Sequence, residues 1–320
     1  MAKLARVRSI LAKEEVTYGT DPTPTGADNA IQVSALEINP AESDILSRDL
    51  IRGYLGNSPQ LIANTRVTVT FTVEYAGSGT AGTAPQYGPL LKACGFSETV
   101  VAATSVTYAP VSTSFDSVTM YIDNDGIRHI VSGARGTFTV SLNANQIPVY
   151  NFTMTGQYNA PTDTASPTLT FQNQATPQIF NDTNTTSFEI YSETGLALQS
   201  VELDLGNEVV YRELVNSDKE VLITNRAATA NFVIECPTIA TADFFALAVA
   251  GTSGNLSIVH GTSGGNIITL SSPATGLSLG NPTYSEDQGI VMLNLPTTMV
   301  PSDSGNDEIT LVYTLSLIHI

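Results

Sequence analysis

Apolar and polar residues alternate along much of this chain, most regularly in the stretch TRVTVTFTVEY, which begins at Thr65. Val67, Val69, Phe71 and Val73 occupy every second position there, with Thr residues between them. Because successive side chains of a strand point to opposite faces of a sheet, the pattern predicts a strand with one buried face. Further strands are predicted at SVTMYIDNDGIRHIV, GTFTVSL and VYNFTMTGQY, with a hairpin turn at DNDG.

A second series of predicted strands begins near Leu198, with LQSVELDLG and TANFVIEC. It continues with NLSIVHG, NIITLSS and GIVMLNLPTTMV. Two apolar stretches, PQYGPLLKACGF and TADFFALAVAG, are short enough for helices of two or three turns, and each reaches a glycine at its end. The second series therefore repeats the order of elements in the first.

Three landmarks occur in the same order in both series. They are the Arg-acid phrases SRDLI and YRELV at Arg48 and Arg212, the residues Glu74 and Glu235, and the glycines Gly95 and Gly251. The number of residues between the two members of each pair decreases slowly along the chain, as duplication with shorter loops in the second copy would produce. Any two β-rich segments share alternation, but alternation alone does not preserve this order. The sequence predicts two tandem copies of one β module.

The remaining segments separate these modules. EEVTYGTDPTPTGADNAIQV is rich in Gly, Pro and Thr and has no periodicity, so residues 1–35 are predicted as an extended N-terminal arm. The modules are placed at 36–158 and 191–314, with a Pro-, Thr- and Asn-rich connector at 159–190. The final LSLIHI resembles the translated end of a transposon used in preparing sequencing libraries. We expect 315–320 to be non-native sequence.

Charge narrows the range of partners. The chain of 320 residues has a net charge of −17, and charged residues make up only 13% of it. Four of its 13 basic residues are Lys3, Arg6, Arg8 and Lys13, so the rest of the chain is strongly acidic. Such a surface repels nucleic acid phosphates and excludes a gripping DNA-binding role. No secretory signal or membrane span is predicted, and we expect synthesis in the cytoplasm.

The sequence offers little for catalysis or metal binding. His129, His260 and His319 lack partners at metal-binding spacing, and Cys94 and Cys236 form no Cys-x-x-Cys pair. The DNDG stretch lacks the remaining ligands of a calcium loop, and the Gly-rich VHGTSGGN lacks the Lys and the following helix of a phosphate loop. We therefore predict no enzyme activity, no catalytic or metal-binding residues, and no cofactor.

Several phrases together resemble the major tail tube proteins of long-tailed bacteriophages. They are AKEEVTYGTDPTPTGADNAI, SRDLIRGYLG, AGSGTAGTAPQYGPLLKACGF, ELDLGNEVVYRELVNS and VHGTSGGNIITL. The resemblance extends from about Ala12 to Thr314. It implies a mainly β fold in which each module is a sandwich of two packed antiparallel sheets with a short flanking helix. It also implies a structural virion protein of the tail, in which inner sheets of neighbouring modules form a continuous barrel around a lumen.

The resemblance implies several partners. The subunit would associate with itself in rings that stack into a tube, would enclose the tape measure protein and would meet the tail terminator and distal tail proteins. DNA would pass through the lumen without specific binding, and no membrane would be involved. Two modules per chain suggest trimeric rings with pseudo-sixfold symmetry, while six chains per ring is the alternative. Contractile and non-contractile tails both remain open. A secreted β-sandwich adhesin or surface-layer protein is the other class, although it should carry an export signal.

The two Arg-acid phrases each follow a predicted strand and precede a polar connection to the next strand. Such long excursions are candidates for contacts outside the module. The predicted subunit or ring contacts are Arg48, Asp49, Arg52, Arg212 and Glu213. The alternative is ion pairing at the surface of a single module, which contributes little to stability.

Overall fold

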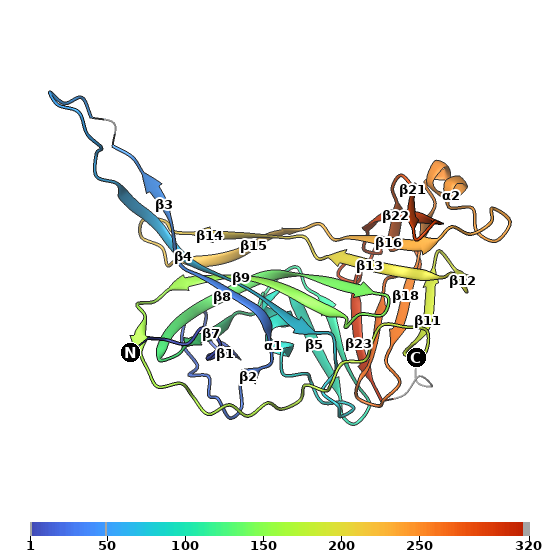
Figure 1. The fold of residues 1–320 in the computed structure, drawn as a ribbon, viewed down its shortest axis with the longest axis horizontal. Coiled ribbons are helices and arrows are strands. Elements are labelled where there is room, and N and C mark those ends of the chain that lie inside the picture. Colours follow the sequence, from blue (N-terminus) through green and yellow to red (C-terminus); the bar gives the residue numbers. More distant parts are fainter. Residues whose placement is uncertain (1, 49, 316–320) are drawn as a thin grey trace.

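The computed structural model describes residues 2–48 and 50–315, and strands make up most of its regular structure (Figure 1). The first part contains β1 (Arg8–Glu14), β2 (Ala30–Ile31), β3 (Ser34–Leu46), β4 (Leu61–Glu74), α1 (Gly88–Ala93), β5 (Phe96–Val101), β6 (Ser105–Pro110), β7 (Val118–Asn124), β8 (Ile127–Asn143), β9 (Val149–Tyr158) and β10 (Thr162–Asp163). The second part contains β11 (Thr185–Ile190), β12 (Glu193–Thr194), β13 (Leu198–Asp204), β14 (Asn207–Arg212), β15 (Glu220–Arg226), β16 (Thr229–Glu235), α2 (Phe244–Ala250), β17 (Ser253–Gly254), β18 (Leu256–His260), β19 (Ile267–Ser271), β20 (Leu277–Leu279), β21 (Thr283–Asp287), β22 (Ile290–Met299) and β23 (Thr310–Thr314).

Two sheets form the body of the molecule. Within the described residues, 14 strands form one large sheet and seven form a smaller sheet in the order β12-β11-β18-β19-β23-β6-β5. The large sheet contains an unbroken antiparallel run, β21-β22-β16-β13-β8-β9-β4-β3. Strands β14 and β15 form a separate hairpin. The mainly β fold predicted from the alternation is confirmed.

The core lies between the two sheets. The predicted inward positions Val67, Val69, Phe71 and Val73 of β4 are all buried, as their alternation requires. Aromatic residues of neighbouring strands continue this face, and Phe71 and Phe152 stack with ring centroids 5.5 Å apart. One contiguous cluster of buried side chains extends through both halves of the chain. The core is therefore common to both sets of strands.

The two halves of the chain also share their sheets. Strand β13 pairs with the second half of β8, and β23 pairs with β6 on one side and β19 on the other. The predicted boundaries at 36–158 and 191–314 thus separate stretches whose strands are hydrogen-bonded to each other. The predicted connector, 159–190, runs along the body and contributes β10 and β11.

Both predicted short helices are present, but their surroundings differ. Helix α1 buries Leu90 and Leu91, whereas α2 buries only Phe244 and leaves Val249 exposed. Each is followed by a glycine with a positive φ, +87° at Gly95 and +62° at Gly251, a conformation that a side chain makes costly. The predicted glycine stops are confirmed.

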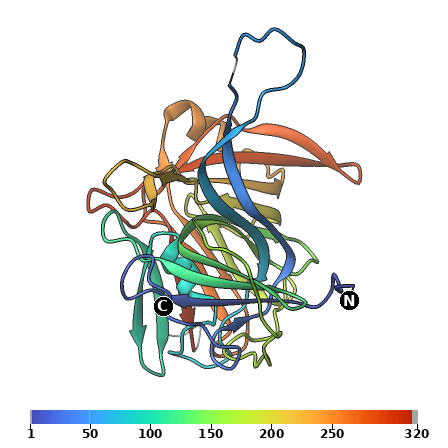
Figure 2. The same ribbon diagram turned by 90° about the vertical axis from the view of Figure 1, so that its left-hand side faces the viewer.

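The N-terminal segment, for which the sequence predicts an extended arm, lies against the body. Strand β1 pairs with β7, and its residues Ile10, Leu11 and Ala12 are buried. By contrast, the outer part of the β3–β4 hairpin rises away from the body (Figure 2). This hairpin is therefore the most projecting part of the described chain.

Candidate assembly interface

The β14–β15 hairpin, residues Asn207–Arg226, crosses the first half of the chain and is here called the second arm. It lies along β8 and β9 (Figure 1). The chain leaves the large sheet at Gly206, whose φ of +63° turns the backbone away from β13. Just beyond the turn, the Asn207 side-chain amide donates to the carbonyls of Cys94, at 2.7 Å, and Gly136, at 2.9 Å. These bonds attach the base of the second arm to the end of α1.

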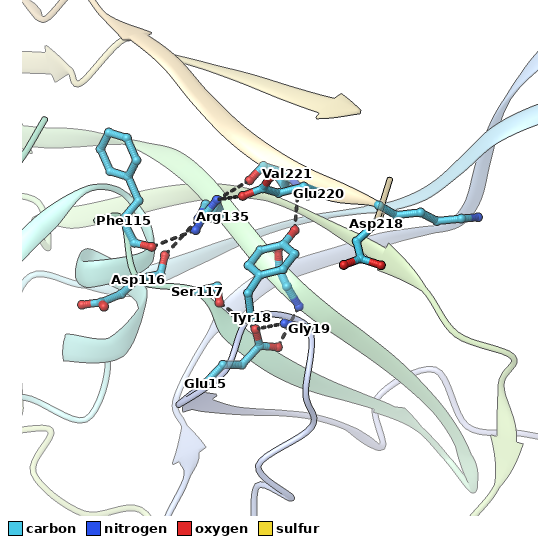
Figure 3. Close-up of polar contacts among 12 residues, drawn as sticks. Glu15, Tyr18, Gly19, Phe115, Asp116, Ser117, Arg135, Asp218, Glu220 and Val221 are labelled. Carbon is cyan, nitrogen blue, oxygen red and sulfur yellow. Dashed lines mark hydrogen bonds and ion pairs between the residues drawn. The ribbon is translucent and has the colours of Figure 1, made fainter. Parts of the chain in front are cut away.

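Arg135 on β8 connects the second arm to the body (Figure 3). Its guanidinium donates to the carbonyl of Val221 at 2.6 Å, and also to the carbonyls of Phe115, at 2.8 Å, and Asp116, at 3.2 Å. The Glu220 carboxylate accepts from the same group at 3.3 Å. Arg135 itself is only 7% exposed. One buried cation therefore satisfies backbone acceptors on both sides of the contact.

Tyr18 and Glu15 complete this polar cluster. The Arg135 guanidinium carbon lies 4.8 Å from the centroid of the Tyr18 ring. The Val221 N–H donates to the Tyr18 hydroxyl at 2.6 Å, and burial raises the pKa of that phenol. The buried Glu15 carboxylate accepts from the Gly19 N–H, at 2.7 Å, and the Ser117 hydroxyl, at 2.6 Å. The N-terminal segment thus helps to hold the second arm in place.

The predicted contact residues lie at the outer ends of two different hairpins. Arg48 is exposed just beyond β3, and the guanidinium of Arg52 lies 5.8 Å from the Tyr54 ring centroid. Arg212 is exposed at the end of β14, and the Glu213 carboxylate lies 3.1 Å from the Lys219 ammonium. Asp49 lies outside the described residues. The residues that attach the second arm, Arg135 and Tyr18, were not predicted.

The outer part of β3–β4, Glu42–Arg66, is here called the first arm. At its base the Arg66 guanidinium pairs with the carboxylates of Glu42 and Asp44, at 2.5 and 3.3 Å. The Thr68 hydroxyl and Arg66 together lower the pKa of Glu42. Toward the tip, exposed apolar side chains gather: Ile45, Leu46, Leu50, Ile51, Tyr54, Leu55, Leu61 and Ile62. An isolated two-stranded hairpin with so much exposed apolar surface indicates a surface that meets another molecule.

The large sheet also has two unpaired edges at opposite ends of its central run. Among the described strands, β3 pairs only with β4, and β21 pairs only with β22. Exposed edges present rows of unpaired N–H and C=O groups, which makes them sites for pairing with another chain. Two unpaired strand edges and one projecting apolar arm are therefore the candidate sites for association with another chain.

Metal binding and membrane spanning by a helix find no support in the described residues. No group of three or more His, Cys, Asp and Glu side chains is arranged to hold a metal ion within the described ranges. Neither helix in that part of the chain is long and apolar enough to cross a membrane. His260 is buried, with its ring nitrogens 3.1 Å from the Thr185 hydroxyl and from the Gln178 carbonyl. Cys94 is buried and Cys236 is half-buried.

These features describe a β-rich protein with two unpaired strand edges, a projecting apolar hairpin and a continuous core. The family model for phage tail tube proteins matches residues 5–314, and the chain belongs to this family. The resemblance identified from the sequence is thereby confirmed, and the protein is a structural component of a phage tail. A comparison with curated proteins found no match.

Proposed function

We propose that this chain is the major tail tube subunit, and that its copies form rings that stack into the tube. The observation that carries the proposal is the junction between β8 and β13 within one chain. There β13 extends the sheet of β8, with Glu202 opposite Ser141 and Asp204 opposite Thr139. The same kind of junction, repeated between the free edges of β21 and β3, would join one chain to the next. Head-to-tail contacts of this kind close into rings when the rotation returns to the start.

Strand order supports the two-module organisation as part of this proposal. The run β21-β22-β16-β13-β8-β9-β4-β3 consists of two sets of four with the same internal order. In the second set β9 follows β8 and pairs with β4, as β22 follows β21 and pairs with β16 in the first. We infer that 36–158 and 191–314 are equivalent modules. Edge β21 then corresponds to β8, and edge β3 to β13.

This correspondence specifies the register of the proposed junction. Glu202 of β13 pairs with Asn231 of β16, and Glu37 of β3 pairs with Thr70 of β4, so Glu202 and Glu37 are equivalent positions. Ser285 of β21 takes the place of Ser141 of β8. We propose that Glu37 of one copy lies opposite Ser285 of the next.

The sheet face opposite the core fits a channel for DNA. It carries hydroxyl, amide and carboxylate groups: Thr68, Thr70, Thr72, Thr139, Asn151, Thr153, Thr155, Glu202, Asp204, Thr229 and Asn231. Arg66 lies at the end of this row of β4 but is paired with Glu42 and Asp44. The positions named above contain no Lys or Arg, so phosphates passing them would not be retained through counterion release. We propose that this face lines the lumen, encloses the tape measure protein and lets DNA pass without specific binding. The tail terminator and distal tail proteins would contact the two ends of the tube.

The first prediction concerns ring symmetry. Two equivalent modules per chain should give rings of three chains with pseudo-sixfold symmetry, because each chain supplies two of six similar sectors. Electron microscopy of tubes assembled from the purified chain should show three whole chains per ring. A ring of six whole chains would contradict the trimer, and a protein that forms neither rings nor tubes would contradict the function.

The second prediction concerns the Arg-acid phrases. If Arg48 and Arg212 contact neighbouring subunits or rings, Arg48→Glu and Arg212→Glu should weaken tube assembly at low ionic strength. The defect should shrink in about 0.5 M salt, where charges are screened within a few ångströms. Assembly followed by light scattering and microscopy measures both conditions. Unchanged assembly in both would assign these residues to surface pairing within the chain.

A further inference from the structure

The two arms are alike in sequence and pairing. The first arm contains LIAN at residues 61–64, and the second contains LITN at residues 222–225. In the first, Ile62 lies opposite Ile45 and Leu61 opposite Leu46. In the second, Ile223 lies opposite Val209 and Leu222 opposite Val210. Two similar apolar cross-strand pairs therefore occupy matching places in the two hairpins.

Their surroundings are very different. Ile223 is 8% exposed because the second arm lies on the body, whereas its counterpart Ile62 is 71% exposed. Ile45, which faces Ile62 across the first arm, is 61% exposed. In the second arm Ile223 is buried and its partner Val209 is half-buried, whereas the corresponding pair of the first arm extends into solvent (Figure 2). The first arm therefore has no surface of the body beside it that corresponds to the one covered by the second arm.

The surface under the second arm shows what is missing. Ile223 packs near Gly95, at the end of α1, where an added Cβ would lie 3.7 Å from its Cδ1 atom. Asn207 binds the carbonyls of Cys94 and Gly136 beside it. The surface covered by the second arm thus consists of the C-terminal end of α1 and of Gly136, which lies shortly before the part of β8 that pairs with β13.

The second half of the chain has the same two features uncovered. Helix α2 ends at Gly251, and Gly280 lies shortly before β21, as Gly136 lies shortly before the part of β8 that joins β13. Val249, two residues before Gly251, is 91% exposed, and Ala250 is exposed as well. This surface lies at the opposite end of the molecule from the first arm (Figure 1). An arm of the same chain therefore does not cover it.

We propose that the first arm of one copy docks on this surface of the next copy, with Ile45 and Ile62 against Val249 at the end of α2. The occupant is a second copy of this chain, because the second arm shows how a hairpin of this sequence covers such a surface. The proposal rests on the ring proposed above and adds a contact outside its strand edges. In the proposed junction β3 runs antiparallel to β21 of the neighbouring copy. Strand β3 continues directly into the first arm, so the junction would direct that arm toward Gly280 and α2 of the neighbour.

Paired cysteines test the contact. In tubes of a chain that carries both Ile62→Cys and Val249→Cys, a short bis-maleimide should join residue 62 of one copy to residue 249 of the next, and denaturing gels should show dimers and trimers. Each single variant controls for reaction of Cys94 and Cys236. The pair Glu37→Cys and Ser285→Cys reports the strand junction independently. Tubes that cross-link through 37 and 285 but not through 62 and 249 would overturn the arm contact alone. Absence of rings and of both cross-links would overturn the proposed function too.

A charge introduced at one arm provides the second measurement. Ile62→Asp should leave the melting temperature close to that of the parent, because the side chain is exposed, but should raise the concentration needed for assembly about tenfold or more. The matched variant Ile223→Asp buries its charge and should lower the melting temperature by roughly 10 °C. Val16→Asp, at a fully exposed apolar residue outside the arms, should alter neither quantity. Normal assembly of Ile62→Asp would contradict the docking.

Discussion

Replacing Arg135 with alanine should lower the free energy of unfolding by about 2–4 kcal/mol, because hydrogen bonds to a charged donor contribute about 1.5–3 kcal/mol and buried acceptors left without a partner cost about 1–3 kcal/mol. Arg135 is 7% exposed, and its guanidinium donates to the carbonyls of Phe115, Asp116 and Val221. Without it these acceptors lose a partner where water reaches poorly, and the Tyr18 ring loses the cation stacked on it. The partly exposed Glu220 carboxylate adds little, because solvent screens that pair.

Urea unfolding measured by circular dichroism would give the change. The control is Lys219→Ala on the same arm, where an exposed ammonium pairs with Glu213 and where the loss should stay below about 1 kcal/mol. Equal stability of the two variants would mean that Arg135 does not hold the second arm, and that Asn207, Tyr18 and the apolar contacts do. Limited proteolysis within residues 207–226 should become faster in Arg135→Ala, since that hairpin loses its attachment.

Single prolines in β21 should separate folding from assembly. Adjacent residues of an antiparallel edge strand point their N–H groups to opposite sides, so one of Ser285 and Glu286 directs its N–H toward β22 and the other outward. Proline at the outward position removes only a donor that a neighbouring chain would use. That variant should keep its melting temperature and lose tube formation almost completely. Proline at the other position should lower the melting temperature.

Calorimetry and negative-stain microscopy of both variants decide the matter. If both proline variants fold and still build tubes, β21 is not the joining edge. Glu193→Pro in β12, at an edge of the smaller sheet, serves as a control that should leave the rings intact. Because the two sheets face different sides of the core, this comparison also tests which sheet lines the channel.

Local patterns were sufficient for much of the fold. The alternation around Val67 and Phe71 predicted a strand with one buried face, and both side chains are buried in the core. The DNDG turn joins β7 to β8, with positive φ at Asp125 and Gly126. These elements were predictable because strand alternation and left-handed turn positions depend on neighbouring residues.

Sequence patterns predicted less of the candidate interface than of the fold. Arg135 and Tyr18 act together with Val221, which is far from both along the chain, and no local spacing reveals that contact. The one available signal was a lone Arg among small residues in SGARGTF, within a chain that has few basic residues. The phrases around Arg48 and Arg212 indicated the hairpins, but their role in assembly stays a prediction.

The sequence by itself determined many of the strands, their apolar faces, where both helices stop, and the family to which the chain belongs, but it missed β1 and β2 in the predicted arm. Only the tertiary structure decided what happens to the two similar arms. LITN is packed on the body and LIAN projects into solvent, although their residues and cross-strand pairs are nearly the same. The reason is physical: burial depends on which surface lies beside a hairpin. Within one chain the second arm reaches α1, while the first arm points away from α2.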